Sequence, residues 1–214
     1  MDVVVDNLDL FFEGMRVTVS LTLLSYAAAF VIGTVIAAFR VSPVPPLQAV
    51  GAFYVATVRN TPLAVLMIGF LVGAGDVGIK YSFFYTAVVV LSAYTGAFIA
   101  EAIRSGVNAV SRGQGEAARA LGLTFPQVLW IVVLPQALRT VVAPLGSIFI
   151  ALIKNSALAA LISVDELGGT TEQLINETAR PIPIFIGAAI AYLVLTIPSG
   201  LVLGGIERRL AIRR

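Results

Sequence analysis

The sequence predicts an all-α membrane protein with about five transmembrane helices, and three observations lead to this fold class. Hydrophobic residues make up 58% of the 214 residues. Charged residues make up only 12%, about half the share found in an ordinary soluble domain. The charges are also clustered, so that residues 17–39 and 83–100 contain none. A stretch of about 20 apolar residues is long enough to cross a bilayer as a helix.

Hydropathy and its polar interruptions divide the chain into spans of suitable length. We expect a single transmembrane domain over residues 1–214, with spans near residues 17–39, 50–72, 83–103, 133–153 and 184–206. The longest polar connections are then a loop at residues 104–132 on one side and a re-entrant loop at residues 155–183 on the other.

The distribution of charge predicts how the chain crosses the membrane. Residues 207–214 contain four arginines, so the positive-inside rule places the C-terminus in the cytoplasm. An odd number of spans then places the N-terminus outside. The same orientation puts Arg40, Arg104, Arg112 and Arg119 inside, and it puts Asp76, Asp165, Glu166, Glu172 and Glu177 outside.

The N-terminal segment is acidic, with Asp2, Asp6, Asp9 and Glu13 and no basic residue before Arg16. This polarity is wrong for a cleavable signal peptide, so we expect the first span to remain in the mature protein. Two interpretations of the segment stay open: a short amphipathic helix lying on the outer surface, or a disordered leader.

The composition also excludes several classes of chemistry. The chain has no cysteine and no histidine, which removes disulfides, thiolate nucleophiles, imidazole bases and the usual zinc and haem ligands. A net charge of +2 is too small to indicate nucleic-acid binding. Most enzyme chemistry is therefore excluded, and we expect this chain to bind no metal or cofactor of its own.

The polar segment 111–135 predicts two short helices joined by a sharp turn. Residues 114–121 are rich in helix formers, and Gly122 follows where a left-handed glycine would end the helix. Thr124 and Gln127 have the spacing of a capping box, and Pro126 falls in the first turn of the second helix. This pattern predicts a helix-turn-helix projection on the cytoplasmic face.

The same segment carries a resemblance to a known family. Glu116-Ala117-Ala118, then Gly122, then Val132-Val133-Leu134-Pro135 resembles the EAA loop of bacterial ABC importer permeases, with Val132 in place of the usual isoleucine. The wider match to the histidine, glutamine and glutamate permease branch lies in Arg59-Asn60-Thr61-Pro62-Leu63, Glu101 to Gly106, Gly113-Gln114, Leu134 to Arg139 and Lys154 to Leu158. Within that branch the chain looks most like actinobacterial glutamate permeases.

The resemblance implies a multi-pass subunit in the bacterial cell membrane that translocates a polar amino acid of the glutamate or glutamine class. An extracytoplasmic amino-acid-binding protein would deliver the substrate, and a second permease chain, identical or homologous, would complete the path. A separate ABC ATPase dimer would hold ATP and Mg²⁺ and engage the EAA loop. The coupling residues implied by the match are Gly113, Gln114, Glu116, Ala117, Ala118, Gly122, Leu134 and Pro135.

A candidate substrate site lies where the fourth span ends, at Lys154, Asn155 and Ser156. We expect the chain to break at Asn155 and to restart as a half-helix whose N–H groups face a cavity, with Asn60 and Thr61 as further donors. A purely structural interpretation explains the same residues equally well, because Asn and Ser are good N-caps and Lys154 could sit at the headgroup level.

Arg59 is predicted to lie inside the cytoplasmic edge of the membrane, next to Pro62. We expect it to bond carbonyls freed at Pro62 or the carboxylate of Glu101, and so to serve gating or support. The competing interpretation is that Arg59 snorkels to lipid phosphate.

Other functions fit the sequence less well. Gly73-Ala74-Gly75-Asp76 has the pattern of an intramembrane aspartyl protease, but no second Asp lies in a predicted span. The glycines before Lys80 approach a phosphate loop, but Ile79 interrupts it and no Ser or Thr follows. A secondary transporter or channel would commonly show inverted repeats and acids within its spans. A structural membrane subunit would leave Arg59 and Lys154 unexplained.

Overall fold

The computed structural model describes residues 2–78 and 82–210, and within these ranges the regular structure is helical throughout. Five elements are long helices: α2 (Leu8–Val41), α3 (Pro45–Asn60), α5 (Phe83–Ala109), α8 (Leu134–Asn155) and α10 (Pro181–Leu210). The shorter ones are α1 (Asp2–Val5), α4 (Leu63–Asp76), α6 (Arg112–Ala120), α7 (Phe125–Gln127), the π-helix η1 (Val128–Val133), the 3₁₀ helix η2 (Ser156–Ile162) and α9 (Leu167–Thr178). The predicted all-α class is therefore confirmed.

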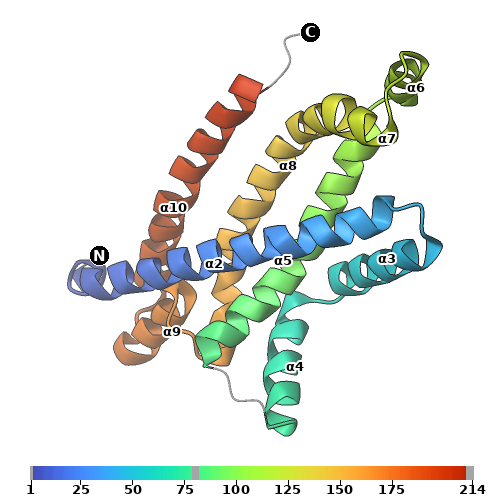
Figure 1. Ribbon diagram of the computed structural model, residues 1–214. Coiled ribbons are helices and arrows are strands. Elements are labelled where there is room, and N and C mark those ends of the chain that lie inside the picture. The colour runs from blue at the N-terminus through green and yellow to red at the C-terminus, as the bar shows by residue number, and fades with distance from the viewer. Residues whose placement is uncertain (1, 79–81, 211–214) are drawn as a thin grey trace.

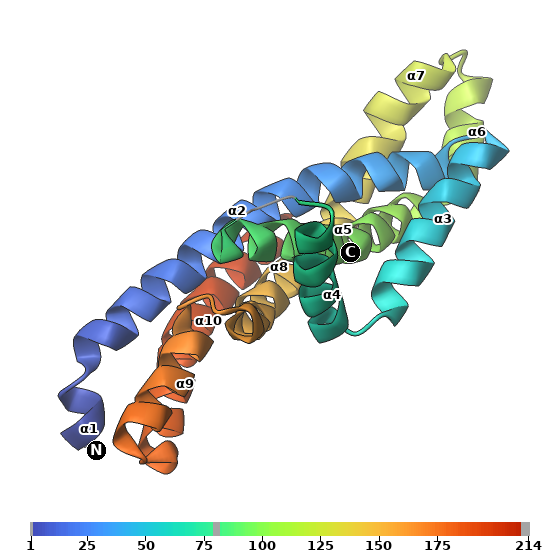
Figure 2. The same cartoon turned by 90° about the horizontal axis from the view of Figure 1, so that it is seen from below.

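The molecule is elongated, with different elements at its two ends. Figures 1 and 2 show α6 and α7 projecting at one end, whereas α1 and α9 lie together at the other. We call these the α6 end and the α9 end. The long helices run between them, and four or five helical segments are long and apolar enough to cross a membrane.

The second predicted span is not one straight helix. Helices α3 and α4 meet at 105° across a short break, where Thr61 is extended (φ −98°, ψ 131°). Pro62 causes the break, because proline disfavours the α conformation in the residue before it and cannot donate a backbone hydrogen bond. The span expected near residues 50–72 is thus a broken one, made of two helices that meet at Pro62.

Helices α2 and α5 approach each other closely at glycine and alanine residues. A Cβ atom added at Gly33 would lie 2.8 Å from the carbonyl oxygen of Gly96 and 2.6 Å from Cγ2 of Ile99. Ala37, Ala97 and Ala100 continue the small-residue contact and are buried. Small residues at a helix crossing let the backbones approach closely, which is the usual means of packing helices in a bilayer.

The fourth span does not break at Asn155, so the predicted half-helix beginning there is wrong. Asn155 (φ −69°, ψ −22°) and Ser156 (φ −58°, ψ −27°) are both right-handed helical, and α8 continues directly into η2. The hydroxyl of Ser156 donates to the carbonyl oxygen of Ile153 at 2.8 Å and does not cap a new helix. The helix ends only at Ser163, which is left-handed (φ 60°).

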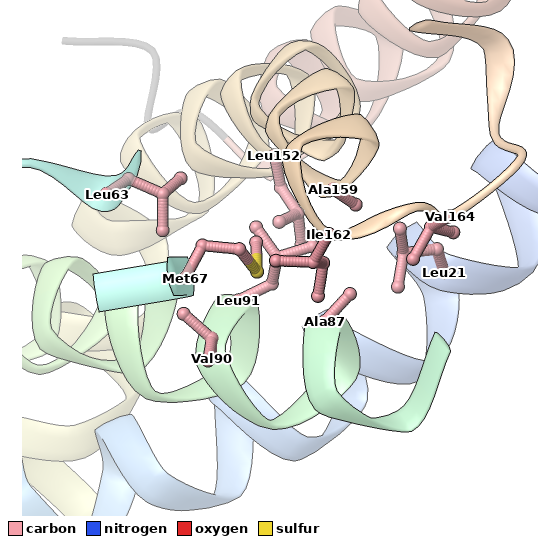
Figure 3. Close-up of a cluster of buried hydrophobic side chains, with 10 residues drawn as sticks. All are labelled: Leu21, Leu63, Met67, Ala87, Val90, Leu91, Leu152, Ala159, Ile162 and Val164. Atoms are coloured by element: carbon pink, nitrogen blue, oxygen red, sulfur yellow. The ribbon is translucent and has the colours of Figure 1, made fainter. Parts of the chain in front are cut away.

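Helix η2 is held in place by a buried apolar cluster that also anchors α4. Figure 3 shows Leu63 and Met67 from α4 directed towards the residues of α8, η2 and α5 in this cluster. Its members are Leu21, Leu63, Met67, Ala87, Val90, Leu91, Leu152, Ala159, Ile162 and Val164. Because Leu63 follows the α3–α4 break and Leu152 precedes the end of α8, the cluster brings these two segments together.

The acidic N-terminal segment is helical rather than a disordered leader. Asp2–Val5 form α1, and α2 already begins at Leu8. Phe11 is buried against α9 and α10 in a second cluster with Leu167, Leu174, Ile184, Ala188 and Ala191. The segment is therefore packed on the bundle, at the α9 end.

Two features of the sequence lie outside the described residues. Ile79 and Lys80, which belong to the approximate phosphate-loop pattern, are not described, and neither are the last four residues, which include two of the C-terminal arginines. Asp76, from the protease-like pattern, is exposed at the end of α4.

Candidate functional site

The projection at the α6 end has the geometry that its sequence predicts. Gly122 is left-handed (φ 86°), its N–H donates to Arg119 O at 2.9 Å, and the N–H of Leu123 donates to Ala118 O at 3.2 Å. This pair of bonds is a Schellman motif, which satisfies carbonyls left free at the end of α6. The prediction that a left-handed glycine ends this helix is confirmed.

The second helix of the projection begins with half of the predicted capping box. The side chain of Gln127 accepts the N–H of Thr124 at 2.8 Å, as in a capping box. The hydroxyl of Thr124, however, donates to the same Gln127 oxygen at 3.0 Å instead of accepting from the backbone. The chain then continues through η1 into α8, where Pro135 lies in the first turn. Segments of π-helix are frequent at functional sites.

The EAA residues divide between contact with the chain and exposure. Ala118 is buried, as is Val128 of η1, and the two elements pack together. Glu116 and Ala117 are exposed, and within the described residues Glu116 takes part in no ion pair. Trp130 is exposed in the same projection, and its sequence context, an apolar run entering a span, gave no sign of this. Gly113, Gln114 and Pro135 are exposed and Leu134 is half-buried.

A cluster of charges lies on α2, α3 and α5, centred on Glu101. Oε2 of Glu101 accepts a hydrogen bond from Arg40, and Oε1 accepts one from Arg104. Arg59 lies farther away, with its Nη1 atom 3.7 Å from Oε2 of Glu101. The guanidinium of Arg59 also stacks on the ring of Phe98, 5.0 Å from its centroid. Arg59 thus contacts Glu101, one of the two partners expected for it, whereas sequence reasoning missed Arg40 because this contact joins residues 61 positions apart.

The residues proposed for the outer substrate site are only partly available to a ligand. Lys154 is exposed and Asn155 is half-buried, but Ser156 is fully buried. Asn60 and Thr61 donate to carbonyl oxygens of their own helix, at 2.7 Å to Ala56 and 2.8 Å to Thr57. Ser156 is therefore a structural residue in this conformation.

A buried carboxylate at the α9 end escaped sequence reasoning, which placed Glu166 on the outer side of the membrane but did not predict its burial. Glu166 is fully buried and caps α9, accepting the N–H of Gly169 at 3.0 Å. Its other oxygen accepts the hydroxyls of Thr18 at 3.2 Å and Tyr192 at 3.0 Å. Burial raises the pKa of Glu166, and these hydrogen bonds oppose that shift. The only local signal was the position of Glu166 at the start of α9.

The described residues contain no group of three carboxylate, imidazole or thiol side chains placed to hold a metal ion. The features that remain are an apolar helical bundle, a helix-turn-helix projection at one end and a charge cluster near it. Together they define a helical membrane protein with a projecting helix-turn-helix segment.

Comparison with known proteins assigns this membrane protein to a family. Residues 29–212 match the model of the binding-protein-dependent transport system inner membrane component family, and the chain belongs to that family. It is therefore the membrane component of a bacterial transport system.

Three similar proteins show how far the likeness extends. A probable glutamine ABC transporter permease of Bacillus subtilis is 36% identical over 98% of this chain and 97% of its own length. A glutamate transport system permease of Corynebacterium glutamicum is 37% identical over 92% of each chain. A crystal structure of an amino acid ABC transporter with histidines is 32% identical, with a TM-score of 0.91 over 96% of each chain.

Proposed function

We propose that this chain is the membrane-spanning subunit of an ATP-driven importer for a polar amino acid of the glutamate or glutamine class. The observation that carries the proposal is near-full-length identity of 36–37% to permeases described for glutamine and glutamate. The projection at the α6 end supplies what such a subunit needs, because a chain without its own ATP-hydrolysing site must receive force from a partner.

In this proposal the α6 end faces the cytoplasm and the N-terminus lies outside. Arg40, Arg104 and Arg119 lie in helices that end near the α6 end, and Arg208 and Arg209 lie in the last turn of α10. Helices α1 and α9 and the start of α2 lie at the opposite end (Figure 2), and these segments carry more acidic residues than basic ones, which are Arg16 in α2 and Arg180 just after α9. This distribution agrees with the positive-inside rule.

The projection would dock on an ABC ATPase dimer, which holds ATP and Mg²⁺. Exposed Gln114, Glu116 and Ala117 offer one acid and small neighbours, a shape that fits a groove between protein lobes. No atom lies within 4 Å of a Cβ added at Gly113, so a partner can approach its backbone. The buried contact of Ala118 and the left-handed Gly122 would hold α6 rigid enough to transmit force.

A second permease chain, identical or homologous, would complete the translocation path. Many large apolar side chains on α3, α4 and α10 remain exposed, and they would face lipid or the second chain. An extracytoplasmic binding protein would deliver the amino acid at the α9 end. Lys154 and Asn155, with Asn60 and Thr61, are the proposed contacts for the charged groups of the substrate on that side.

Reconstitution tests the proposal. The chain, its cognate ATPase and its binding protein are placed in proteoliposomes, and uptake of labelled glutamate and glutamine is followed with and without ATP. ATP-dependent uptake that requires the binding protein is expected. Uptake by the permease alone, driven by an ion gradient, would instead show a secondary transporter, and no uptake of any amino acid by an assembled complex would refute the amino-acid assignment.

The outer contacts are tested in the same vesicles with Lys154→Gln. Loss of uptake with intact assembly and basal ATPase activity is expected. An unchanged apparent affinity would reduce Lys154 to a membrane anchor.

A further inference from the structure

A hollow of about 420 Å³ lies between α3, α5 and α8, next to the Glu101 charge cluster. Its walls include Arg59, Phe98, Glu101, Ser105, Thr140 and Pro144. Ile148 is the lining residue of α8 nearest to Lys154, and it is six residues before it, which is about 9 Å along a helix. Lys154 and Asn155 therefore lie beyond the hollow, whereas Asn60 and Thr61 directly follow Arg59 on its wall.

The cluster beside this hollow has more positive than negative charge. Three guanidinium groups surround one carboxylate, and Arg40 and Arg104 already occupy its two oxygens. Arginine stays protonated in proteins, so the cluster carries an excess of two positive charges. Such an excess attracts an anion.

Arg59 is the member of the cluster that is available to a ligand. Its side chain is 39% exposed and its one ionic contact is long, at 3.7 Å. A guanidinium has five N–H donors. Within the described residues, Arg59 makes this ionic contact but donates no side-chain hydrogen bond. The Phe98 ring lies under the guanidinium of Arg59, and this cation–π contact helps to hold the charged group on the wall. Arg59 is thus a cationic donor group on the wall of the hollow.

We infer that this hollow is a second binding site, in which Arg59 holds the carboxylate of the transported amino acid on its way to the cytoplasm. A planar carboxylate, like a phosphate, can accept two parallel hydrogen bonds from the paired donors of a guanidinium. The hydroxyl oxygens of Ser105 and Thr140, on the opposite walls, accept hydrogen bonds from the ammonium group. The inference rests on the proposed function, since it takes the ligand to be an amino acid.

The position of the hollow fits release of the substrate. Glu101 and Ser105 lie in the last third of α5, and Thr140 lies in the second turn of α8, both towards the α6 end. An amino acid that leaves the outer contacts and moves towards the cytoplasm between α3 and α8 therefore meets Arg59 before it leaves the protein.

Binding of L-glutamate to the nucleotide-free complex of permease and ATPase tests the inference. The complex is held in phosphatidylcholine nanodiscs without binding protein. Arg59→Gln should weaken binding by about 10- to 100-fold, the usual range for loss of a hydrogen-bonded charge pair. Arg208→Gln, which removes an exposed arginine on α10, should change it less than about twofold.

A change in the ligand separates contact from a structural role. The α-amide of glutamate lacks the α-carboxylate charge, so the wild-type complex should bind it more weakly, and Arg59→Gln should affect it less than it affects glutamate. If Arg59→Gln does not assemble, Arg59→Lys is used in its place. Arg59→Lys should then show a smaller difference in affinity between glutamate and its α-amide than wild type shows.

Three results would overturn the inference. In the first, wild-type and Arg59→Gln complexes bind glutamate with equal affinity, although the wild-type complex imports glutamate. Another is the absence of glutamate binding to such a complex. The third is that phosphatidylglycerol in the nanodisc displaces glutamate from wild type but not from Arg59→Gln, because the hollow would then hold a lipid phosphate. Failure of the assembled wild-type complex to import any amino acid would instead refute the proposed function.

Discussion

Replacing Gly122 by valine should uncouple transport from ATP hydrolysis while leaving the membrane bundle folded. Gly122 has φ 86°, and an L-residue in the left-handed region costs roughly 1–2 kcal/mol. If the turn opens instead, the two Schellman bonds from Gly122 and Leu123 are lost, at roughly 0.5–1.5 kcal/mol each. Either route costs about 1–3 kcal/mol, which lowers the population of correctly placed α6 by roughly 5- to 160-fold.

The effect should remain local, because no atom lies within 4 Å of a Cβ added at Gly122. A helix of nine residues is too short to be stable by itself in water, so α6 depends on this turn and on its contact with η1. The assay is the number of ATP molecules hydrolysed per amino acid imported in proteoliposomes. Gly122→Val should raise this number several-fold.

Gly205→Val is the matched control. Gly205 also has open space around it, but it lies within α10, outside the projection, and has no positive φ, so valine there introduces no left-handed backbone strain. Its coupling ratio should stay near wild type, and its assembly should be normal. Wild-type coupling in Gly122→Val would refute the reasoning.

Three further predictions concern stability. Burial raises the pKa of Glu166 above its ordinary value of 4.5. Its contribution to the stability of the folded protein is therefore greatest at pH below that value and is lost as the pH rises through the folded-state pKa. Glu166→Gln should flatten this part of the plot of unfolding temperature against pH. Gly33→Ala should destabilise the detergent-solubilised protein by about 1–3 kcal/mol, since its Cβ would lie 2.6 Å from Ile99, whereas Gly204→Ala, in open space, should be neutral or stabilising. Glu101→Gln should lower the unfolding temperature, because it leaves three arginines facing one another.

The parts of the site that could be predicted from the sequence depend on short-range rules. Gly122 is left-handed because only glycine adopts that conformation without strain, and the turn lies within a few residues of its own helix. The bond from Thr124 N–H to Gln127 is likewise formed three residues apart. Such features are fixed by neighbours in the chain, so a single sequence contains the information.

The predicted break at Asn155 failed for the opposite reason. Asn and Ser favour helix starts locally, but contacts with distant segments decided the conformation here. Ala159 and Ile162 of η2 pack with Leu63 and Met67 of α4, and this burial keeps the chain helical through Asn155. No rule about neighbouring residues includes that contact.

Glu166 shows the same limit for charge. A carboxylate in a polar loop is usually solvated, and the hydroxyl groups that make burial possible come from Thr18 and Tyr192, 148 and 26 residues away. The Glu101 cluster is similar, since its arginines come from three helices. Sequence patterns located these acids but could not reveal how many partners each would have.

The cluster around Phe11 at the α9 end shows that different parts of this chain are stabilised in different surroundings, one in water and the other in lipid. Helix α9 carries exposed Glu172 and Glu177 on one side and buried Leu167 and Leu174 on the other, so water drives its apolar side onto Phe11 and Ile184. Inside the bilayer no such drive exists between helices, and close contacts such as Gly33 with Gly96 take its place. Urea, which weakens association driven by water, should therefore detach α9 before it separates α2 from α5.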